Sequence, residues 1–194
     1  TPLTTIKANA EMLEFWSNSL EEKEKTKANR YIGRMLGEVD RLTSIMNDML
    51  IIGRLESGKT RVQKRMTDLV HLCSEIIDKN FSNESDARQV SVKIEGSPYL
   101  VPVDTNIIEH ILNNLISNAL KYSPDAKAPM VMVNFKNNKS LRLSVQDFGL
   151  GIPEDEINNV FNAFYRSENT RQIKGTGMGL AIVKHVLHQH EAQL

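Results

Sequence analysis

The sequence predicts an α-helical hairpin followed by an α+β sandwich, in two domains that cover residues 1–57 and 63–194. Two observations support this prediction. The first domain has apolar residues at helical spacing and no alternating strand pattern. In the second domain, helical and strand-like segments alternate, which is typical of helices that cover one face of a sheet.

The bulk composition excludes several classes of protein. Lys plus Arg and Asp plus Glu both number 24, so the net charge is zero and nothing favours a nucleic-acid partner. The single cysteine, Cys73, excludes an internal disulfide and suits a reducing compartment; its apolar neighbours predict a buried side chain. No run of eighteen apolar residues and no signal peptide is present, so we expect a cytoplasmic chain whose membrane anchor, if any, lies in other segments.

Each predicted hairpin helix has an apolar seam with alternating steps of three and four residues. The first seam contains Leu3, Ile6, Ala10, Leu13 and Leu20, and the second contains Ile32, Met35, Val39, Leu42, Met46 and Met49. This stripe is too wide for one helix pair to bury. Dimerisation into a four-helix bundle would bury it, and the alternative is a hairpin that packs on the rest of the same chain.

The second domain is predicted element by element. Residues 54–65 form a linker or a first edge strand, and residues 67–81 form a helix. Strands at 89–96 and 98–104 follow, with a turn at 96–98 between them. A helix over 104–123 has Asp104 as its N-cap. Residues 129–149 form a hairpin that turns at Asn137 and Asn138. The irregular stretch 151–174 contains a short helix at 155–161, and the last helix begins near Gly177.

The helix over 104–123 carries an unusual polar stripe opposite its apolar one. His110, Asn114, Asn118 and Lys121 follow one another at helical spacing and therefore share a face. A polar stripe is usually only the wet side of a helix, but two asparagines in a helix interior cost helix propensity. Amide oxygens can bind Mg2+ together with phosphates, and a lysine one turn further on can pair with a phosphate.

Two glycine-rich stretches accompany this stripe. Residues 175–179 read Gly-Thr-Gly-Met-Gly directly before a helix, where bare amides and the positive helix end suit a phosphate. Residues 147–153 follow a strand; Asp147 could accept a hydrogen bond from an exocyclic amine, and Gly149 and Gly151 allow a flat ligand to approach. The alternatives are a glycine turn without a ligand and a strand-ending Asx turn at Asp147.

Five segments, in order, resemble the catalytic core of bacterial sensor histidine kinases. "TPLTTIKANAEML" resembles the segment after the phosphoacceptor histidine, "NLISNALKYS" the asparagine box, and "DFGLGI" the first glycine box. "VFNAFYR" resembles the phenylalanine box and "GTGMGLAIV" the second glycine box. The resemblance covers nearly the whole chain. It implies a dimerisation and histidine-phosphotransfer hairpin, followed by an ATP-binding domain of the fold shared with DNA gyrase.

The resemblance also implies roles for individual residues. It implies that Asn118 holds Mg2+ beside Asn114, that Asp147 reads adenine, and that residues 151–174 form a mobile lid. The full set implied for ATP is Asn114, Asn118, Lys121, Tyr122, Asp147, Gly149, Gly151, Ile152, Phe164, Arg166, Gly175, Thr176, Gly177, Met178, Gly179 and Leu180. Thr1 matches the threonine that orients water when the family dephosphorylates its partner, a response-regulator receiver domain.

The chain departs from the family pattern at both ends. The phosphoacceptor histidine would lie four residues before Thr1, and no histidine lies on the hairpin. We expect His185, His188 and His190 on the exposed end of the last helix. The family continues past residue 194 into two more strands, so a sheet edge would be exposed.

Two other functions remain open. One is a related ATPase or serine kinase of the same nucleotide fold, but such ATPases place a glutamate at Asn114, and asparagine cannot act as a general base. The other is a non-catalytic dimerising scaffold, which would not need Asn118, Asp147 and three loop glycines.

Overall fold

The chain folds into two compact units, Thr1–Gly53 and Arg54–Leu194. The structure is a computed structural model, and it describes residues 2–17, 22–56, 62–82, 88–137, 140–170, 173 and 175–189. Residues 57–61, where the predicted domains meet, lie outside these ranges, so the boundaries at 57 and 63 stay a prediction. Each unit is described by itself below.

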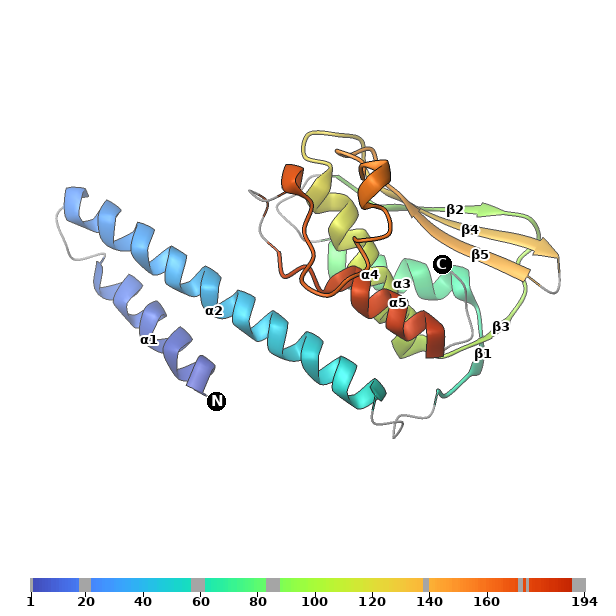
Figure 1. The fold of residues 1–194 in the computed structure, drawn as a ribbon, viewed down its shortest axis with the longest axis horizontal. Coiled ribbons are helices and arrows are strands. Elements are labelled where there is room, and N and C mark those ends of the chain that lie inside the picture. The colour runs from blue at the N-terminus through green and yellow to red at the C-terminus, as the bar shows by residue number, and fades with distance from the viewer. Residues whose placement is uncertain are drawn as a thin grey trace. The chain divides into compact units, whose positions relative to one another are not determined.

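The first unit is a pair of antiparallel helices, α1 (Pro2–Ser17) and α2 (Glu22–Glu56) (Figure 1). Polar contacts set the alignment of the two helices. Near the closed end, the Ser17 hydroxyl donates to Asn29 Oδ1; further along, Lys7 Nζ lies 3.1 Å from Asp40 Oδ1. Ala10, Ile32 and Val39 are buried between the helices.

Most of the predicted apolar seam remains exposed in this helix pair. The exposed fractions are 50% for Ile6, 46% for Leu13, 45% for Met35, 50% for Leu42, 52% for Met46 and 53% for Met49. Leu20 lies outside the described residues. The stripe is therefore wider than one hairpin covers, as the residue spacing predicts.

The second unit contains a three-stranded sheet in the order β2 (Ser91–Glu95), β4 (Met130–Asn137), β5 (Ser140–Gln146). β4 runs parallel to β2 and antiparallel to β5. A separate antiparallel pair joins β1 (Arg65–Thr67) to β3 (Val101–Val103). Alternation along β4 turns Val131, Val133 and Phe135 toward the core, where each is buried.

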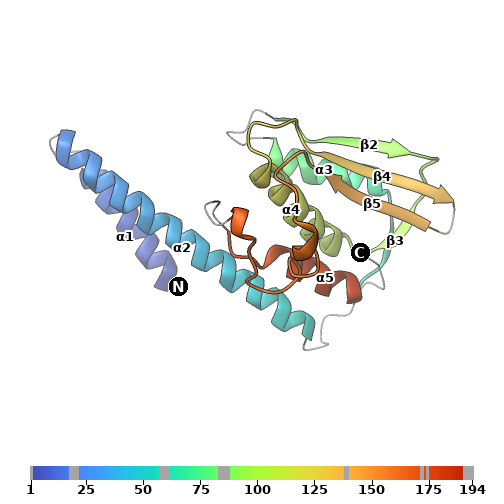
Figure 2. The same ribbon diagram turned by 45° about the horizontal axis from the view of Figure 1, so that its top comes forward.

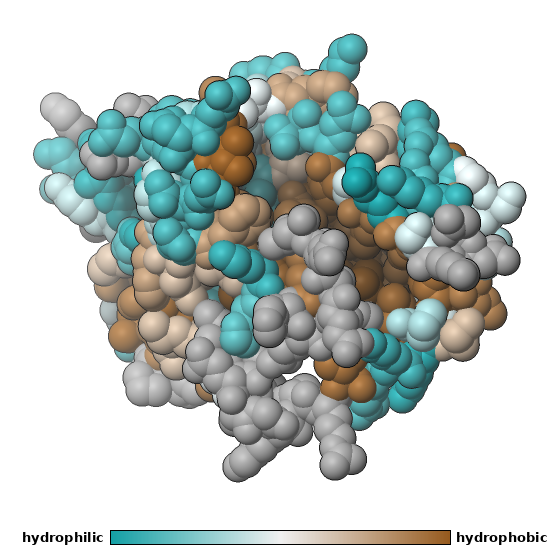
Figure 3. Space-filling view, turned by 45° about the vertical axis from the view of Figure 1, so that its right-hand side comes forward, coloured by the Kyte–Doolittle hydropathy of each residue, from teal (hydrophilic) through white to brown (hydrophobic). Residues whose placement is uncertain are grey.

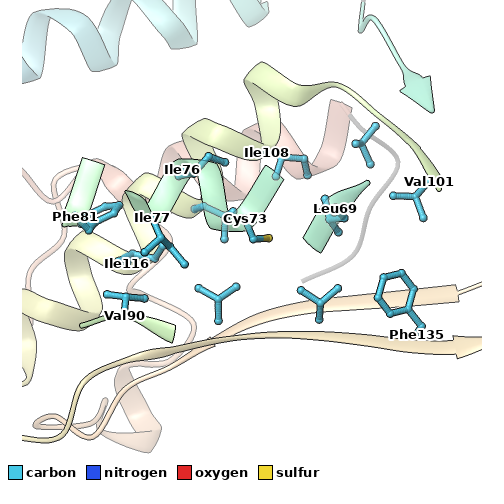
Figure 4. Close-up of a cluster of buried hydrophobic side chains, with 14 of the residues drawn as sticks. Leu69, Cys73, Ile76, Ile77, Phe81, Val90, Val101, Ile108, Ile116 and Phe135 are labelled. Atoms are coloured by element: carbon cyan, nitrogen blue, oxygen red, sulfur yellow. The ribbon is translucent and has the colours of Figure 1, made fainter. Parts of the chain in front are cut away.

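Three helices lie on the same side of this sheet (Figure 2): α3 (Leu69–Phe81) and α4 (Thr105–Tyr122) pack against it, and α5 (Gly179–Gln189) packs against α4. Asp68 caps α3 and Asp104 caps α4, each accepting two backbone N–H bonds; Asp104 also accepts from Gln63 N at 2.8 Å. The apolar sides of α3 and α4 meet the sheet in one core (Figure 4). The predicted α+β sandwich with helices on one face is confirmed.

Two of the predicted strands are shorter in the structure than the sequence predicts. The strands at 89–96 and 98–104 exist in shortened form as β2 and β3, but they belong to different sheets. Between them, Gly96 has a φ of +82°, and a Cβ atom there would lie 2.1 Å from the carbonyl oxygen of Phe135. The chain can therefore leave the sheet here only with glycine.

Three predicted segments also have different boundaries in the structure. Asn137 pairs with Ser140 and belongs to β4, so the prediction that Asn137 is a turn residue is wrong; Asn138 lies outside the described residues. The helix predicted at 155–161 is only a 3-10 turn, Glu154–Glu156, followed by hydrogen-bonded turns. The stretch 54–65 begins as the end of α2, and its strand begins at Arg65, its last residue.

One face of the molecule gathers apolar side chains around a hollow (Figure 3). The residues of β5 that face the core, Leu141, Leu143 and Val145, are only partly buried.

Among the described residues, no helix is long and apolar enough to cross a membrane.

Candidate functional site

Helix α4 supplies one wall of the site. Its predicted apolar stripe is confirmed, with Leu115 half-buried and the other members buried: Ile108, Ile111, Leu112, Ile116 and Ala119. On the opposite side, His110 is exposed, and Asn114, Asn118 and Lys121 are half-buried. A fully wet stripe would leave the last three exposed, so another part of the chain lies against them.

That part is the glycine stretch before α5. A Cβ atom at Gly179 would lie 2.7 Å from Asn114 Oδ1 and 3.7 Å from Asn118 Nδ2. A Cβ atom at Gly175 would lie 2.2 Å from Lys121 Nζ and 3.6 Å from the Tyr122 hydroxyl. The stretch therefore crosses the polar stripe along its length, and it comes this close only because both positions lack a side chain.

The turn inside the glycine stretch is held by its own contacts. Thr176 Oγ1 accepts from Met178 N at 3.2 Å, and Met178 is 2% exposed, so its side chain anchors the start of α5. Leu180 is half-buried in the first turn of α5. Since α5 begins at Gly179, its free N-terminal amides open beside Asn114, where they suit an anion.

Gly177 joins this turn to the segment that contains Phe164. It has a φ of +74°, and its carbonyl oxygen accepts from Phe164 N at 3.0 Å. Phe164 itself has a φ of +65°, which is strained for a residue with a side chain. The contact places this strained residue directly against the glycine stretch.

The second glycine stretch rests on the C-terminal end of α4. Asp147 Oδ1 accepts from Gly149 N at 2.8 Å, which is the predicted Asx turn, and Leu150 N donates to Tyr122 O at 3.1 Å. A Cβ atom at Gly149 would lie 2.3 Å from that same oxygen. Gly151 has a φ of +69°, and Asp147 and Ile152 are exposed at the rim.

Two more residues that the resemblance assigns to the ligand, Phe164 and Arg166, come from the segment between the two glycine stretches. Arg166 Nη2 donates to the carbonyl oxygens of Thr170, at 2.7 Å, and of Ile173, so this nitrogen serves the fold of its own segment. Phe164 is 54% exposed. Lys184 of α5 lies 5.9 Å from the ring centroid of Phe161, which packs this segment against α5.

The pKa of one nearby tyrosine, Tyr165, is also affected by its surroundings. Loss of solvent raises the pKa of Tyr165, and the carboxylate of Glu156 raises it further.

The remaining predicted residues fall into two groups. Thr1 and His190 lie outside the described residues, as does the side chain of His188. The prediction that His185 lies on an exposed helix end is wrong: His185 is half-buried and its Nε2 atom is buried, because α5 turns this side toward the domain. Among the described residues, no group of three His, Cys, Asp or Glu side chains could hold a metal ion.

Sequence reasoning missed Arg88. Its Nη2 donates to Leu120 O at 2.8 Å, and its Nη1 donates to Ser123 O and, at 3.2 Å, to Ser123 Oγ. A lone arginine before a strand carries no pattern in the sequence, so only the tertiary structure shows that it binds the end of α4.

Two family models match the chain. Residues 1–58 match the His Kinase A (phospho-acceptor) domain, and residues 103–194 match the histidine kinase-, DNA gyrase B-, and HSP90-like ATPases. Among curated proteins, sensor histidine kinase WalK of Bacillus subtilis (strain 168) is 31% identical over 98% of this chain and 31% of its own length. The probable sensor kinase SilS of Salmonella typhimurium is 28% identical over 100% of this chain and 39% of its own length.

Solved structures agree on the fold. Full-length ShkA, crystallised in complex with AMPPNP, matches 97% of this chain and 38% of its own, with a TM-score of 0.69 and 22% identity. The mycobacterial sensor histidine kinase MprB matches 66% of this chain and 80% of its own, with a TM-score of 0.51 and 28% identity. The chain spans about a third of the length of the curated relatives it matches.

Proposed function

Because the chain belongs to the sensor histidine kinases of two-component systems, we propose that it binds Mg-ATP and transfers the γ-phosphoryl group to a histidine upstream of Thr1. One observation supports this most strongly. The glycine stretch 175–179 lies directly against Asn114, Asn118 and Lys121, which come from a helix far away in the sequence. Polar groups on one side and bare amides on the other form the kind of cradle that a polyphosphate fits.

The residues of this cradle fit the phosphates and their metal. Lys121 Nζ lies where it can pair with a phosphate, and the N-terminal amides of α5 face the same space. Asn118 contributes a neutral amide oxygen, a ligand that suits Mg2+ when phosphates supply the charge. Mg2+ would neutralise charge on the transferring group.

The other end of the site fits the base. Asp147 is exposed, and its Asx turn with Gly149 N fixes the orientation of the carboxylate. We assign to it the hydrogen bond from the adenine amino group. Gly149, Gly151 and Ile152 would form the surface under the ring, and Tyr122 would lie between the base and the phosphates. Phe164, Arg166, Thr176, Gly177, Met178 and Leu180 complete the predicted lining; Arg166 would have to leave its present carbonyl partners to reach a phosphate.

Asn114 favours transfer over hydrolysis. Its Nδ2 donates to His110 O at 2.9 Å, and a carboxamide cannot take a proton from water. The bound nucleotide is therefore hydrolysed slowly and reacts when a nucleophile is positioned beside it. A neutral imidazole nitrogen attacks the γ-phosphorus, an N–P bond forms as the β–γ bridging P–O bond breaks, ADP leaves, and the second imidazole nitrogen releases its proton.

The partners follow from the same assignment. The exposed seam of the hairpin would close against a second copy of the chain to form a four-helix bundle. The phosphoryl group would then pass to an aspartate of a response-regulator receiver domain. A phosphatase role for Thr1 and a membrane anchor outside this chain belong to the same proposal.

Calorimetric titration with AMPPNP and Mg2+ tests this function. We expect the parent chain to bind and Asp147→Asn to lose at least tenfold in affinity, because a carboxylate acceptor is replaced by an amide. Asp125→Asn is the matched control, since Asp125 is exposed on a nearby turn and its φ of 59° suits asparagine. No binding by a folded parent would overturn the proposal and favour a non-catalytic scaffold.

A further inference from the structure

The C-terminal end of α4 is held by hydrogen bonds from two other segments. α4 ends at Tyr122 with Ser123 as its C-cap, and the φ of Ser123 is −123°, outside the left-handed region. The carbonyl groups at such an end have no partner within the helix and must find one elsewhere. Here Ser123 Oγ donates to Ala119 O, Arg88 donates to Leu120 O, and Leu150 N donates to Tyr122 O.

Arg88 contributes the charged part of this arrangement. Its two terminal nitrogens bind carbonyl oxygens on either side of Tyr122, and one of them also binds the Ser123 hydroxyl. A cation at a helix C-terminus meets the negative end of the helix dipole. The planar guanidinium holds both carbonyls in one fixed geometry, which a lysine cannot do.

The same helix end supports both nucleotide-facing stretches. Lys121 Nζ and the Tyr122 hydroxyl lie against Gly175, and Tyr122 O receives the amide of Leu150, which follows the Asp147 turn. A shift of this end would move Lys121 relative to the α5 amides and would move Asp147 relative to both. Arg88 is bonded to the residues immediately before and after the Lys121–Tyr122 pair.

We propose that Arg88 is a positioning residue for the nucleotide site: it fixes the end of α4 so that the phosphate-facing Lys121 and the base-facing Asp147 turn keep their spacing. The proposal rests on the function proposed above. It assigns no contact between Arg88 and the nucleotide.

The test compares Arg88→Met, which keeps an unbranched apolar chain, with Arg88→Lys and with the control Lys79→Met. Lys79 of α3 also binds α4, through Glu109 at 3.0 Å, but well before the helix end. Calorimetry measures AMPPNP affinity with Mg2+. Hydrogen exchange of the Leu150 amide, read by NMR without nucleotide, is compared with the amides of β4 in the core.

We expect Arg88→Met to lose at least tenfold in affinity and Arg88→Lys to recover part of it, with Lys79→Met unchanged. The Leu150 amide should exchange faster in Arg88→Met while the β4 amides keep the parental rate. Ser123→Ala removes the hydroxyl that accepts from Arg88 and donates to Ala119 O, and it leaves Arg88 in place. It should act in the same direction by a smaller factor, and it replaces Arg88→Met in the test if that variant does not fold.

Two results would overturn the inference. One is an affinity within twofold of the parent in a folded Arg88→Met. The other is an equal acceleration of exchange at Leu150 and throughout β4, which would mean that Arg88 supports only global stability. A parent chain that binds no nucleotide would instead overturn the proposed function, and the exchange of Leu150 would still decide whether Arg88 holds the helix end.

Discussion

Gly179 and Asn114 lie so close that a Cβ atom on the glycine would be 2.7 Å from the carboxamide oxygen of the asparagine. The two residues are far apart in the sequence, and each was a candidate for the same ligand on separate grounds. Their contact joins two motifs into one candidate site, because amides proposed to bind phosphate and amide oxygens proposed to bind Mg2+ would have to face the same space.

Alanine substitutions at two glycines should have different effects, one on nucleotide affinity and the other on the stability of the fold. In Gly179→Ala, only the end of the Asn114 side chain has to move, so we expect stability to change by less than about 1 kcal/mol while AMPPNP affinity falls at least tenfold. In Gly149→Ala, the new Cβ would meet the Tyr122 carbonyl, which is backbone, at 2.3 Å. We expect a stability loss of about 1–3 kcal/mol. Denaturant unfolding and calorimetry measure the two effects; equal stability losses in both variants would contradict this account.

Asn118→Ala should remove the metal-dependent part of nucleotide affinity. With Mg2+ present we expect at least tenfold weaker AMPPNP binding, whereas with EDTA the parent and the variant should differ by less than twofold. The reason is that the amide oxygen is proposed to bind the cation, not the phosphates. Asn113→Ala is the control, since Asn113 is on the same helix but binds Asn80 at 2.9 Å. An equal loss with and without metal would assign Asn118 another role.

Leu42→Glu should convert a dimer into a monomer. Leu42 is 50% exposed on the seam of α2, and a charge there would have to be buried in a four-helix bundle. Light scattering after size-exclusion chromatography measures the mass at several concentrations. Ser44→Glu, an exposed change off the seam, should leave the mass of the parent unchanged. A parent that is monomeric at all concentrations would refute the predicted bundle.

The stability of the second unit should depend on Cys73 at alkaline pH. Burial and, to a lesser extent, the charge of the nearby Asp68 carboxylate together raise the pKa of this thiol from 9.0 to about 12. Because the pKa of the thiol is higher in the folded than in the unfolded chain, the contribution of the protonated thiol to the free energy of unfolding is fully present below pH 9. It is lost between pH 9 and about 12, by about 1.4 kcal/mol per pH unit.

Denaturant unfolding at pH 8 and pH 10 checks this dependence. Cys73→Ala should be less stable than the parent at pH 8, because it leaves a cavity in the core, but it should lose less stability between the two pH values. The other groups titrate alike in both proteins, so the difference reports the thiol. Parallel slopes for the two proteins would show that the thiol ionises freely in the folded state.

Much of the fold follows from local patterns. Helix α4 follows from the spacing of its apolar residues and from its cap at Asp104, and strand β4 follows from the alternation of its residues. Both patterns can be recognised without knowing which elements pack against them. Predictions failed where the chain is polar and short of such patterns. Asn137 is the last residue of β4 and not a turn residue, and residues 155–161 form hydrogen-bonded turns instead of the predicted helix.

The sequence by itself determined which segments form helices, which side of each helix is apolar, and where glycines allow close approach of the backbone. These features depend on periodicity and on backbone freedom within a few residues. It also singled out the asparagines of α4 as chemically unusual. Only the tertiary structure decided that β2 and β3 lie in different sheets, that Gly175 and Gly179 cover the polar stripe, and that Arg88 holds the end of α4. Those relationships join residues distant in the chain, and they depend on packing and hydrogen bonding that no local pattern encodes.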